Sequence, residues 1–364
     1  MPKNNFETLS TLPVSLAFGR LSMLSLITQN DSILLVTTKG AIERKKVEEI
    51  KALTNPKNFT VWSDVSPNPT ITELENSLES LKECAPSVII AFGGGSVIDS
   101  AKVLRSALSN QILNINDLLK NSGQKKSACH ITLIAIPTTA GTGSEVTPFA
   151  TIWDDKNNSK LSLSGIEVCP DFALVDGKQC LSLDEDNTLY SALDSISHSL
   201  ESLWNKNSCK DSRIWAFNSL ELSNNNFLGV LKSPNDLIAR DNISKASTFA
   251  GIAISSTRTA VAHSISYPLT SIFGVPHGLA CSFTLGHLLK INLEDISENS
   301  FELKVLTGTL GMLMEINFRD RLEKYLSLAE LLALNDKMSH PDRIGNYSGK
   351  DFQSVGDLLR QSFV

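Results

Sequence analysis

The stretch Ser87-Val-Ile-Ile-Ala-Phe92, followed by Gly93-Gly-Gly-Ser96, decides the fold class of this chain. An unbroken apolar run of this length is typical of a strand that is buried on both faces of a parallel sheet. The residues after the glycines favour a helix. Glycines between a strand and a helix let the backbone approach a phosphate, and the helix start supplies free N–H groups and a positive dipole end. The stretch therefore predicts a buried strand that leads into a phosphate-binding turn.

The three glycines do not have the G-x-G-x-x-G spacing of the usual dinucleotide fingerprint. A glycine-rich turn that binds no ligand is therefore the alternative interpretation. The strand before the glycines and the helix after them favour phosphate binding.

The same alternation of strands and helices extends to both sides of this stretch. Further strands are expected at 14–18, 32–36, 59–62, 131–136 and 172–175, with helices at 41–54 and 71–84 and a hairpin formed by 149–153 and 160–163. This order predicts a parallel, doubly wound, Rossmann-like sheet. From about residue 183 the pattern changes to long helices, roughly 184–206, 210–231 and 235–256. We therefore expect an α/β dinucleotide-binding domain over residues 1–180 and an all-helical metal-binding and substrate domain over 181–364.

A second loop rich in hydroxyl groups follows the strand predicted at 131–136. It reads Pro137-Thr-Thr-Ala-Gly-Thr-Gly-Ser-Glu-Val-Thr147. Ligands of parallel sheets bind beyond the carboxyl ends of the strands, where this loop begins. The loop is therefore expected to help bind a charged ligand, although a plain Ser/Thr/Gly loop is the alternative.

Four residues of the helical half are suited to bind one metal ion. Asp194-Ser-Ile-Ser-His198 puts a carboxylate and an imidazole one turn apart on one helix face. His263 and His277 flank the segment 264–276, which contains two prolines and a glycine and is expected to turn or break. One carboxylate and three imidazoles suit Fe(II) or Zn(II) better than Mg(II) or Ca(II). Such spacings also occur by coincidence, and spacing alone favours a metal site only slightly.

Composition excludes several classes of partner. The 33 basic and 39 acidic residues give a net charge of −6, which disfavours general nucleic-acid binding. The sequence contains no run of about 18 apolar residues, so it predicts no membrane span. The first residues lack the apolar core of a signal peptide. The six cysteines form no CxxC motif and are expected to be free thiols in a reducing cytoplasm.

Taken in order, the motifs resemble those of the iron-containing (group III) alcohol dehydrogenases. The resemblance is carried by the glycine stretch, the Pro137 loop, Cys169-Pro-Asp-Phe-Ala-Leu-Val-Asp176, the Asp194/His198 pair, and His263 with Pro276-His-Gly278. It covers roughly residues 10 to 290. It implies the fold shared with dehydroquinate synthase, NAD(P)-dependent interconversion of a primary alcohol and an aldehyde, Fe(II) or alternatively Zn(II), and a homodimer.

The resemblance also implies a role for individual residues. Asp194, His198, His263 and His277 match the metal ligands. The positions that match cofactor contacts are Thr38, Gly94, Gly95, Ser96, Asp99, Thr138, Thr139, Thr142 and Lys160.

Two positions depart from the family pattern. NAD-preferring members often carry an aspartate at the end of the strand that corresponds to 33–36, whereas this chain has Thr37-Thr38-Lys39. An acidic group there would repel a 2′-phosphate, so NADPH is expected to be at least tolerated. Many relatives carry a histidine four residues after the third ligand, where this chain has Tyr267. A phenol can also relay a proton, so Tyr267 is a candidate catalytic residue.

Arg258, five residues before His263, is the candidate group for an anionic substrate. The segment from Ser256 to Pro268 resembles the phosphonoacetaldehyde reductase branch of the family, and no acidic residue lies between Asp241 and His277. The predicted reaction is therefore reduction of phosphonoacetaldehyde to 2-hydroxyethylphosphonate. The alternatives are sulfoacetaldehyde or another anionic aldehyde, neutral short-chain alcohols, and, more distantly, a metal- and NAD-dependent lyase of the same fold. A non-catalytic metal or nucleotide sensor is disfavoured by the intact ligands and glycine turn.

Overall fold

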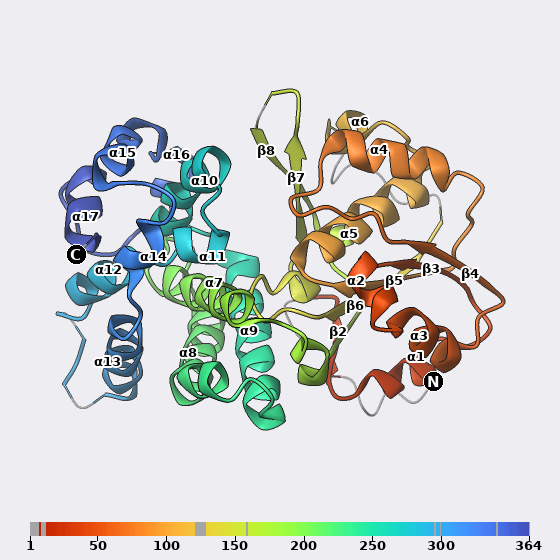
Figure 1. The fold of residues 1–364 in the computed structure, drawn as a ribbon, viewed down its shortest axis with the longest axis horizontal. Helices are drawn as coiled ribbons and strands as arrows, with labels where there is room; N and C mark the ends of the chain where they lie inside the picture. The colour runs from red at the N-terminus through yellow and green to blue at the C-terminus, as the bar shows by residue number, and fades with distance from the viewer. Residues whose placement is uncertain are drawn as a thin grey trace. The chain divides into compact units, whose positions relative to one another are not determined.

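The computed structural model describes residues 7–8, 12–120, 129–157, 159–294, 296–298, 300–339 and 341–363. The chain forms two compact units (Figure 1). Unit 1 comprises the residues up to Thr139 together with Ser144–Cys180, and unit 2 comprises Ala140–Gly143 and the residues from Leu181 onward. The short segment Ala140–Gly143 thus belongs to unit 2, although both of its neighbours in sequence belong to unit 1.

Unit 1 is built on a seven-stranded sheet with the order β1-β2-β9-β6-β5-β3-β4. Its strands are β1 (Glu7–Thr8), β2 (Ser15–Phe18), β3 (Ser32–Val36), β4 (Asn58–Trp62), β5 (Val88–Gly93), β6 (Thr132–Pro137) and β9 (Phe172–Val175). β1 pairs with β2 antiparallel, and the other pairings are parallel. The predicted α/β fold with a parallel sheet is confirmed.

Both faces of the sheet are covered, as a doubly wound sheet requires. Successive strand residues point to opposite faces, so Leu34 and Ile89 pack with α4 (Ile71–Ser80), α5 (Gly95–Asn110) and α6 (Ile115–Lys120). Ile33 and Ile90 pack on the other face, against residues of α1 (Leu24–Ile27), α2 (Lys39–Glu43) and α3 (Lys46–Thr54). The continuous apolar strands are therefore buried on both sides.

The helix predicted over 41–54 is in fact two helices, so this expectation was wrong. α2 ends at Glu43 and α3 begins at Lys46. Between them Lys45 has φ 57°, in the left-handed region. The amphipathic pattern continues through this point, and periodicity therefore did not reveal a single residue that leaves the helical conformation. The hairpin is present as β7 (Phe149–Asp154) and β8 (Ser159–Ser164).

Unit 2 is helical, and every described strand lies in unit 1. Its helices are α7 (Glu185–Leu203), α8 (Lys210–Lys232), α9 (Leu237–Thr257), α10 (Val261–Phe273), α11 (His277–Ala280), α12 (Leu285–Asn292), α13 (Phe301–Met314), α14 (Phe318–Leu322), α15 (Leu328–Ala333), α16 (Pro341–Ile344) and α17 (Val355–Ser362). One large apolar core joins them. Among the described residues, none of the helices has the length and apolar content to cross a membrane.

The segment 264–276 turns, as predicted, and the turn lies near its end. α10 runs through Pro268 as far as Phe273, so most of the segment is helical. The chain turns at Gly274, which has φ 69° and whose N–H donates to the Thr270 carbonyl, while the Val275 N–H donates to the Leu269 carbonyl. This arrangement is the usual glycine ending of a helix. The turn places His277 at the start of α11.

Candidate functional site

The helix α7 carries the first two predicted metal ligands on its buried face. Asp184 caps its start by accepting from the Asn187 N–H. Asp194 and His198 lie one turn apart, and His198 Nε2 is 3.4 Å from Asp194 Oδ1. Both side chains are buried. The i, i+4 spacing therefore brings the carboxylate and the imidazole together, as predicted.

The other two histidines converge on the same carboxylate oxygen. His263 Nε2 from α10 is 3.4 Å from Asp194 Oδ1, and His277 Nε2 from α11 is 3.7 Å from it. The His263 ring also stacks on the His198 ring, with centroids 4.8 Å apart. These separations are long for N–H···O hydrogen bonds. Two donors bound at about 2.1 Å to one tetrahedral ion lie about 3.4 Å apart, so the separations suit ligands that share one cation.

Glu201, which the sequence analysis missed, orients His263 by contacting the ring nitrogen that does not face Asp194. Its Oε2 lies 2.7 Å from His263 Nδ1 and also accepts from the Ala260 N–H. Its Oε1 accepts from the Ala262 N–H at 2.7 Å. This contact assigns a proton to Nδ1 and points Nε2 toward Asp194. A carboxylate behind a histidine ligand is a frequent arrangement in metal sites. Glu201 lies seven residues after Asp194 on α7, and this helical spacing was the available signal.

The charges of the cluster favour a cation at its centre. Burial opposes ionisation of Asp194, but His198, His277 and His263 outweigh it and hold the pKa of this carboxyl far below its ordinary value. Burial disfavours a charged His263, but Glu201 and Asp194 prevail and raise its pKa to about 9. His263 Nε2 is buried and has no hydrogen-bond partner among the described residues. Glu201 and Asp194 favour a positive charge at His263, and either a proton or a bound metal ion can supply this charge. The residues present therefore fit a divalent metal.

A cysteine joins this cluster. The donor atoms of Asp194, His263, His277 and Cys281 all lie within 4.8 Å of one another. Cys281 Sγ donates to Asp194 Oδ1 at 3.6 Å. The sequence analysis expected a free thiol here and gave it no role, although the spacing of four residues from His277 was visible.

α11 is held against α7 by a close backbone approach. A Cβ added to Gly278 would lie 1.7 Å from the carbonyl oxygen of Tyr190. No side chain fits in this space, so a glycine is required at this position. The contact fixes the distance between α7 and two residues that face Asp194, His277 at the start of α11 and Cys281 directly after it.

In unit 1, the glycine turn lies where the sequence predicts it. β5 ends at Gly93, Gly94 is the N-cap of α5, and Gly95 is its first residue. A Cβ on Gly94 would lie 3.2 Å from the Thr139 side chain. Ser96 Oγ accepts from the Asn68 N–H at 3.2 Å. The free N–H groups of a sixteen-residue helix thus begin at the predicted pyrophosphate turn.

The remaining predicted cofactor residues have different environments. Thr138 follows β6, and its N–H donates to the Gly93 carbonyl, so the Pro137 loop begins beside the glycine turn. Asp99 accepts from Ser144 Oγ at 2.5 Å and from the Thr151 N–H at 2.8 Å. Both of its carboxylate oxygens therefore accept hydrogen bonds within unit 1. Lys160 lies on β8, opposite Trp153.

Thr142 belongs to unit 2, with the segment Ala140–Gly143. Gly143 has φ 61°, and a Cβ there would lie 2.4 Å from the Cα of Gly251 on α9. Two glycines therefore let the segment and the helix α9 meet backbone to backbone. This contact sets the position of Thr142.

The turn after β3 contacts a carboxylate, just after β4, that the sequence analysis did not anticipate. Thr38 forms a bridge with Asp64, and Lys39 Nζ lies 2.9 Å from Asp64 Oδ1. The register between β3 and β4, which pairs Val36 with Trp62, brings position 64 opposite position 38. The lysine that could attract a 2′-phosphate is therefore paired with an acidic group.

Arg258 and Tyr267 belong to a second group of residues beside α10. Arg258 is the C-cap of α9, with φ 62°, and its side chain is exposed. Partial burial and the nearby Arg343 lower the pKa of Arg258. The Arg343 guanidinium lies 5.5 Å from the centre of the Tyr267 ring and donates to Thr259. Tyr267 is one turn beyond His263 on α10, so this arginine cluster (Arg258, Thr259, Tyr267 and Arg343) extends along the helix that carries a metal ligand.

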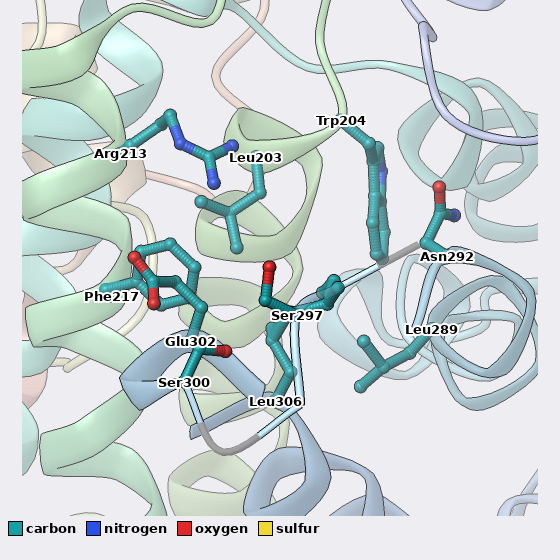
Figure 2. A pocket seen from close by; sticks show the side chains of 11 residues that line it. Leu203, Trp204, Arg213, Phe217, Leu289, Asn292, Ser297, Ser300, Glu302 and Leu306 are labelled. Carbon is teal, nitrogen blue, oxygen red and sulfur yellow. The ribbon is translucent and has the colours of Figure 1, made fainter. Parts of the chain in front are cut away.

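A cavity of about 410 Å³ lies elsewhere in unit 2 (Figure 2). Its walls include Trp204, Phe217, Arg213 and Glu302. The Arg213 guanidinium lies 5.5 Å from the centre of the Phe217 ring. No residue of the metal cluster or of the arginine cluster lines this cavity, so it is a separate feature of the helical unit.

Comparisons with known proteins agree with this geometry. Residues 13–177 match the family "Iron-containing alcohol dehydrogenase", and residues 188–351 match the C-terminal part of the Fe-containing alcohol dehydrogenase family. The 1-propanol dehydrogenase PduQ of Citrobacter freundii is 30% identical over 279 residues, which cover 76% of this chain and 71% of that protein. The chain belongs to the iron-containing alcohol dehydrogenase family.

Two other proteins are similar to this chain. The phosphonoacetaldehyde reductase of Streptomyces viridochromogenes is 35% identical over 217 residues, which cover 58% of this chain and 55% of that protein. The crystal structure of sulfoacetaldehyde reductase from Bifidobacterium kashiwanohense in complex with NAD+ has a TM-score of 0.82 at 24% identity, covering 98% of this chain and 97% of that chain, and this likeness concerns the fold. The matched regions span between 27% and 55% of the first curated relatives.

Proposed function

We propose that this chain reduces a short anionic aldehyde to a primary alcohol with NAD(P)H at a divalent metal site. The proposed substrate is phosphonoacetaldehyde and the product is 2-hydroxyethylphosphonate. The observation that carries the proposal is the buried His263 Nε2, which faces Asp194 Oδ1 at 3.4 Å within a cluster of three histidines. A buried nitrogen without a hydrogen-bond partner is costly unless a ligand occupies it.

Asp194, His198, His263 and His277 would hold the metal. When bound, Fe(II) or Zn(II) supplies Lewis-acid stabilisation of the negative charge that develops on the aldehyde oxygen. Glu201 keeps the proton on His263 Nδ1 and the ring in place. Gly278 keeps α11 close to α7, so that His277 faces the same oxygen of Asp194.

The nicotinamide cofactor would be held by the glycine turn and the Pro137 loop. The N–H groups at the start of α5 suit a pyrophosphate, and Thr138, Thr139 and Thr142 supply hydroxyl groups. The reduced nicotinamide would supply a hydride for the carbonyl carbon, and the carbonyl oxygen would need a proton. We assign delivery of that proton to Tyr267 Oη, because Tyr267 lies one turn beyond His263 on α10.

Specificity for an anion would come from Arg258 and Arg343. Arg343 is a cation close enough to Arg258 to lower its pKa. Two guanidinium groups of like charge are stabilised by an anion between them, and each can bind a phosphonate with two parallel hydrogen bonds. The phosphonoacetaldehyde reductase and sulfoacetaldehyde reductase relatives act on substrates of this kind, which supports the assignment. A sulfonate is the alternative anion, and a neutral short-chain aldehyde is the alternative that does not need these arginines.

A panel of aldehydes tests the proposal. Oxidation of NADH and NADPH is followed by absorbance with phosphonoacetaldehyde, sulfoacetaldehyde and propanal, and bound metal is measured by elemental analysis. We expect one divalent metal per chain and the highest kcat/KM with phosphonoacetaldehyde. A higher kcat/KM with sulfoacetaldehyde would move the assignment to a sulfonate. Equal rates with propanal would favour a general alcohol dehydrogenase, and absence of both metal and turnover would refute the proposal.

A further inference from the structure

We infer that Cys281 is an additional ligand of the metal, so that this site contains a sulfur donor beside its carboxylate and histidines. The inference rests on the proposed metal site and extends it by one residue. It also predicts which metals the site prefers.

The position of the thiol suits a ligand. Cys281 Sγ lies 3.6 Å from Asp194 Oδ1. A thiolate bound at about 2.3 Å and a carboxylate oxygen bound at about 2.0 Å to one ion are about 3.5 Å apart when the angle between them at the ion is about 110°. Cys281 also forms a set of four donor groups with Asp194, His263 and His277, whose atoms lie within 4.8 Å of one another. The thiol therefore lies within reach of an ion bound by Asp194.

A second observation points to a ligand at the same place. His263 Nε2 belongs to this set of four and has no hydrogen-bond partner among the residues that the structure describes. The His263 side chain is 2% exposed, so water does not readily satisfy it. A thiol and an imidazole nitrogen, both buried beside the same carboxylate, together form a soft donor set.

The backbone on both sides of Cys281 is fixed to α7. Ser197 Oγ donates to the Cys281 carbonyl at 3.0 Å, and Ser282 Oγ donates to the Leu193 carbonyl at 2.9 Å. The close approach at Gly278 holds the preceding turn. A ligand needs this kind of support, because small displacements of a donor weaken binding.

The alternative role of Cys281 is that of a hydrogen-bond donor. A buried cysteine often donates to a carbonyl in the preceding turn, and here Sγ is 3.6 Å from the Gly278 carbonyl oxygen. In that case the thiol keeps its proton and only orients Asp194. As a ligand, the thiol releases its proton to the buffer and the sulfur takes one coordination position. The two roles differ in whether a metal–sulfur bond forms, which spectroscopy detects directly.

Cobalt substitution distinguishes the two roles. The metal is removed with a chelator, Co(II) is added without oxygen, and bound cobalt is quantified. We expect one Co(II) per chain and a sulfur-to-cobalt charge-transfer band in the near ultraviolet. The band should be lost in Cys281→Ser and retained in Cys129→Ser, a control in which an exposed thiol of unit 1 is removed. One bound cobalt without this band in the wild-type chain would show that Cys281 is a hydrogen-bond donor, while the proposed function would stand.

X-ray absorption of the zinc-loaded wild-type chain gives the same answer without a variant. One sulfur neighbour at about 2.3 Å from the zinc is expected. A shell of nitrogen and oxygen alone would overturn the inference. If neither cobalt nor zinc binds, the proposed metal site itself fails, and this outcome is distinct from a bound metal without sulfur. Because sulfur ligands favour Zn(II) over harder ions, Cys281→Ser should also lower the affinity for Zn(II) more than that for Mn(II).

Discussion

The metal cluster and the arginine cluster both involve α10, but the charges around their ionisable groups differ. In the metal cluster, Asp194 and His263 are 4% and 2% exposed, and each charged group faces one of opposite sign. In the arginine cluster, Arg258 is exposed and lies near a second cation, Arg343, which lowers its pKa. A buried charge must be matched by the protein itself, whereas an exposed one can be matched by solvent or a ligand.

This difference separates two tasks. The metal cluster is preassembled, so it should serve every aldehyde that reaches it. The arginine cluster contains two cationic side chains, so it should affect those substrates that bring a negative charge. Substitutions in the first cluster are expected to reduce all turnover, and substitutions in the second to change the ranking of substrates.

The largest effect is expected for His263→Ala. Loss of this ligand should remove the bound metal and lower kcat/KM for every aldehyde by several kcal/mol, about a thousandfold or more. Circular dichroism should show that the helices persist. His287→Ala, which removes a half-buried histidine of α12 outside the cluster, is the control. A His263→Ala protein that keeps one metal per chain and full activity would show that the cluster is not the reaction centre.

Glu201→Gln provides a milder change in the same cluster. It keeps the size of the side chain but removes the negative charge that faces His263 Nδ1. Metal affinity should fall about 10- to 100-fold, as for other carboxylates that orient a histidine ligand. Titration with a competing chelator measures this change. An unchanged affinity would mean that the backbone contacts of α10 alone position the ring.

The arginine cluster is tested with two substrates. Arg258→Ala should lower kcat/KM for phosphonoacetaldehyde by about 1.5–3 kcal/mol, or about 10- to 150-fold, the range for a hydrogen bond to a charged group. The kcat/KM for propanal should hardly change. Arg343→Ala should behave in the same way, and Arg213→Ala, in the separate cavity, should affect neither substrate. Equal losses on both substrates would make Arg258 a structural residue and remove the main support for a phosphonate.

The smallest effect is expected at the cofactor turn. Asp64→Ala frees Lys39 from its exposed ion pair and should raise the preference for NADPH over NADH about 2- to 5-fold, the scale of surface pairs. Thr38→Asp should shift the preference toward NADH. The control is Glu79→Ala on α4, which breaks an ion pair with Lys82 that is also exposed. Comparison of kcat/KM for the two cofactors measures the shift, and complete rejection of NADPH by the wild-type chain would contradict the expectation.

Local spacing predicted the residues whose neighbours are close in sequence. Asp194 and His198 meet because residues four apart lie on one face of a helix, and the glycine turn follows directly from a buried strand. Asp64 was missed because its position opposite Thr38 depends on the register of two strands, which is set by long-range packing. Glu201 looked like an ordinary helical glutamate, and its role appears only when α10 approaches α7.

The continuity of the helices has a conformational cause. The segment 264–276 was expected to turn or break, and it does turn at Gly274, but α10 continues through Pro268 up to that point. The break at Lys45 was not expected, because nothing in the amphipathic pattern marks a lysine with positive φ. The main-chain conformation of one residue is decided by its surroundings, so the sequence predicts the existence of helices better than their continuity.

The contact between Gly143 and Gly251 has a consequence for dissecting the protein. Ala140–Gly143 packs with the helical unit, although the chain returns to unit 1 at Ser144. A fragment cut after Cys180 would therefore keep a backbone segment whose docking partner, α9, has been removed. The helical fragment would in turn expose the surface of α9 around Gly251. The two family segments, residues 13–177 and 188–351, are adjacent in sequence, but expressing them separately would divide one of the folded units.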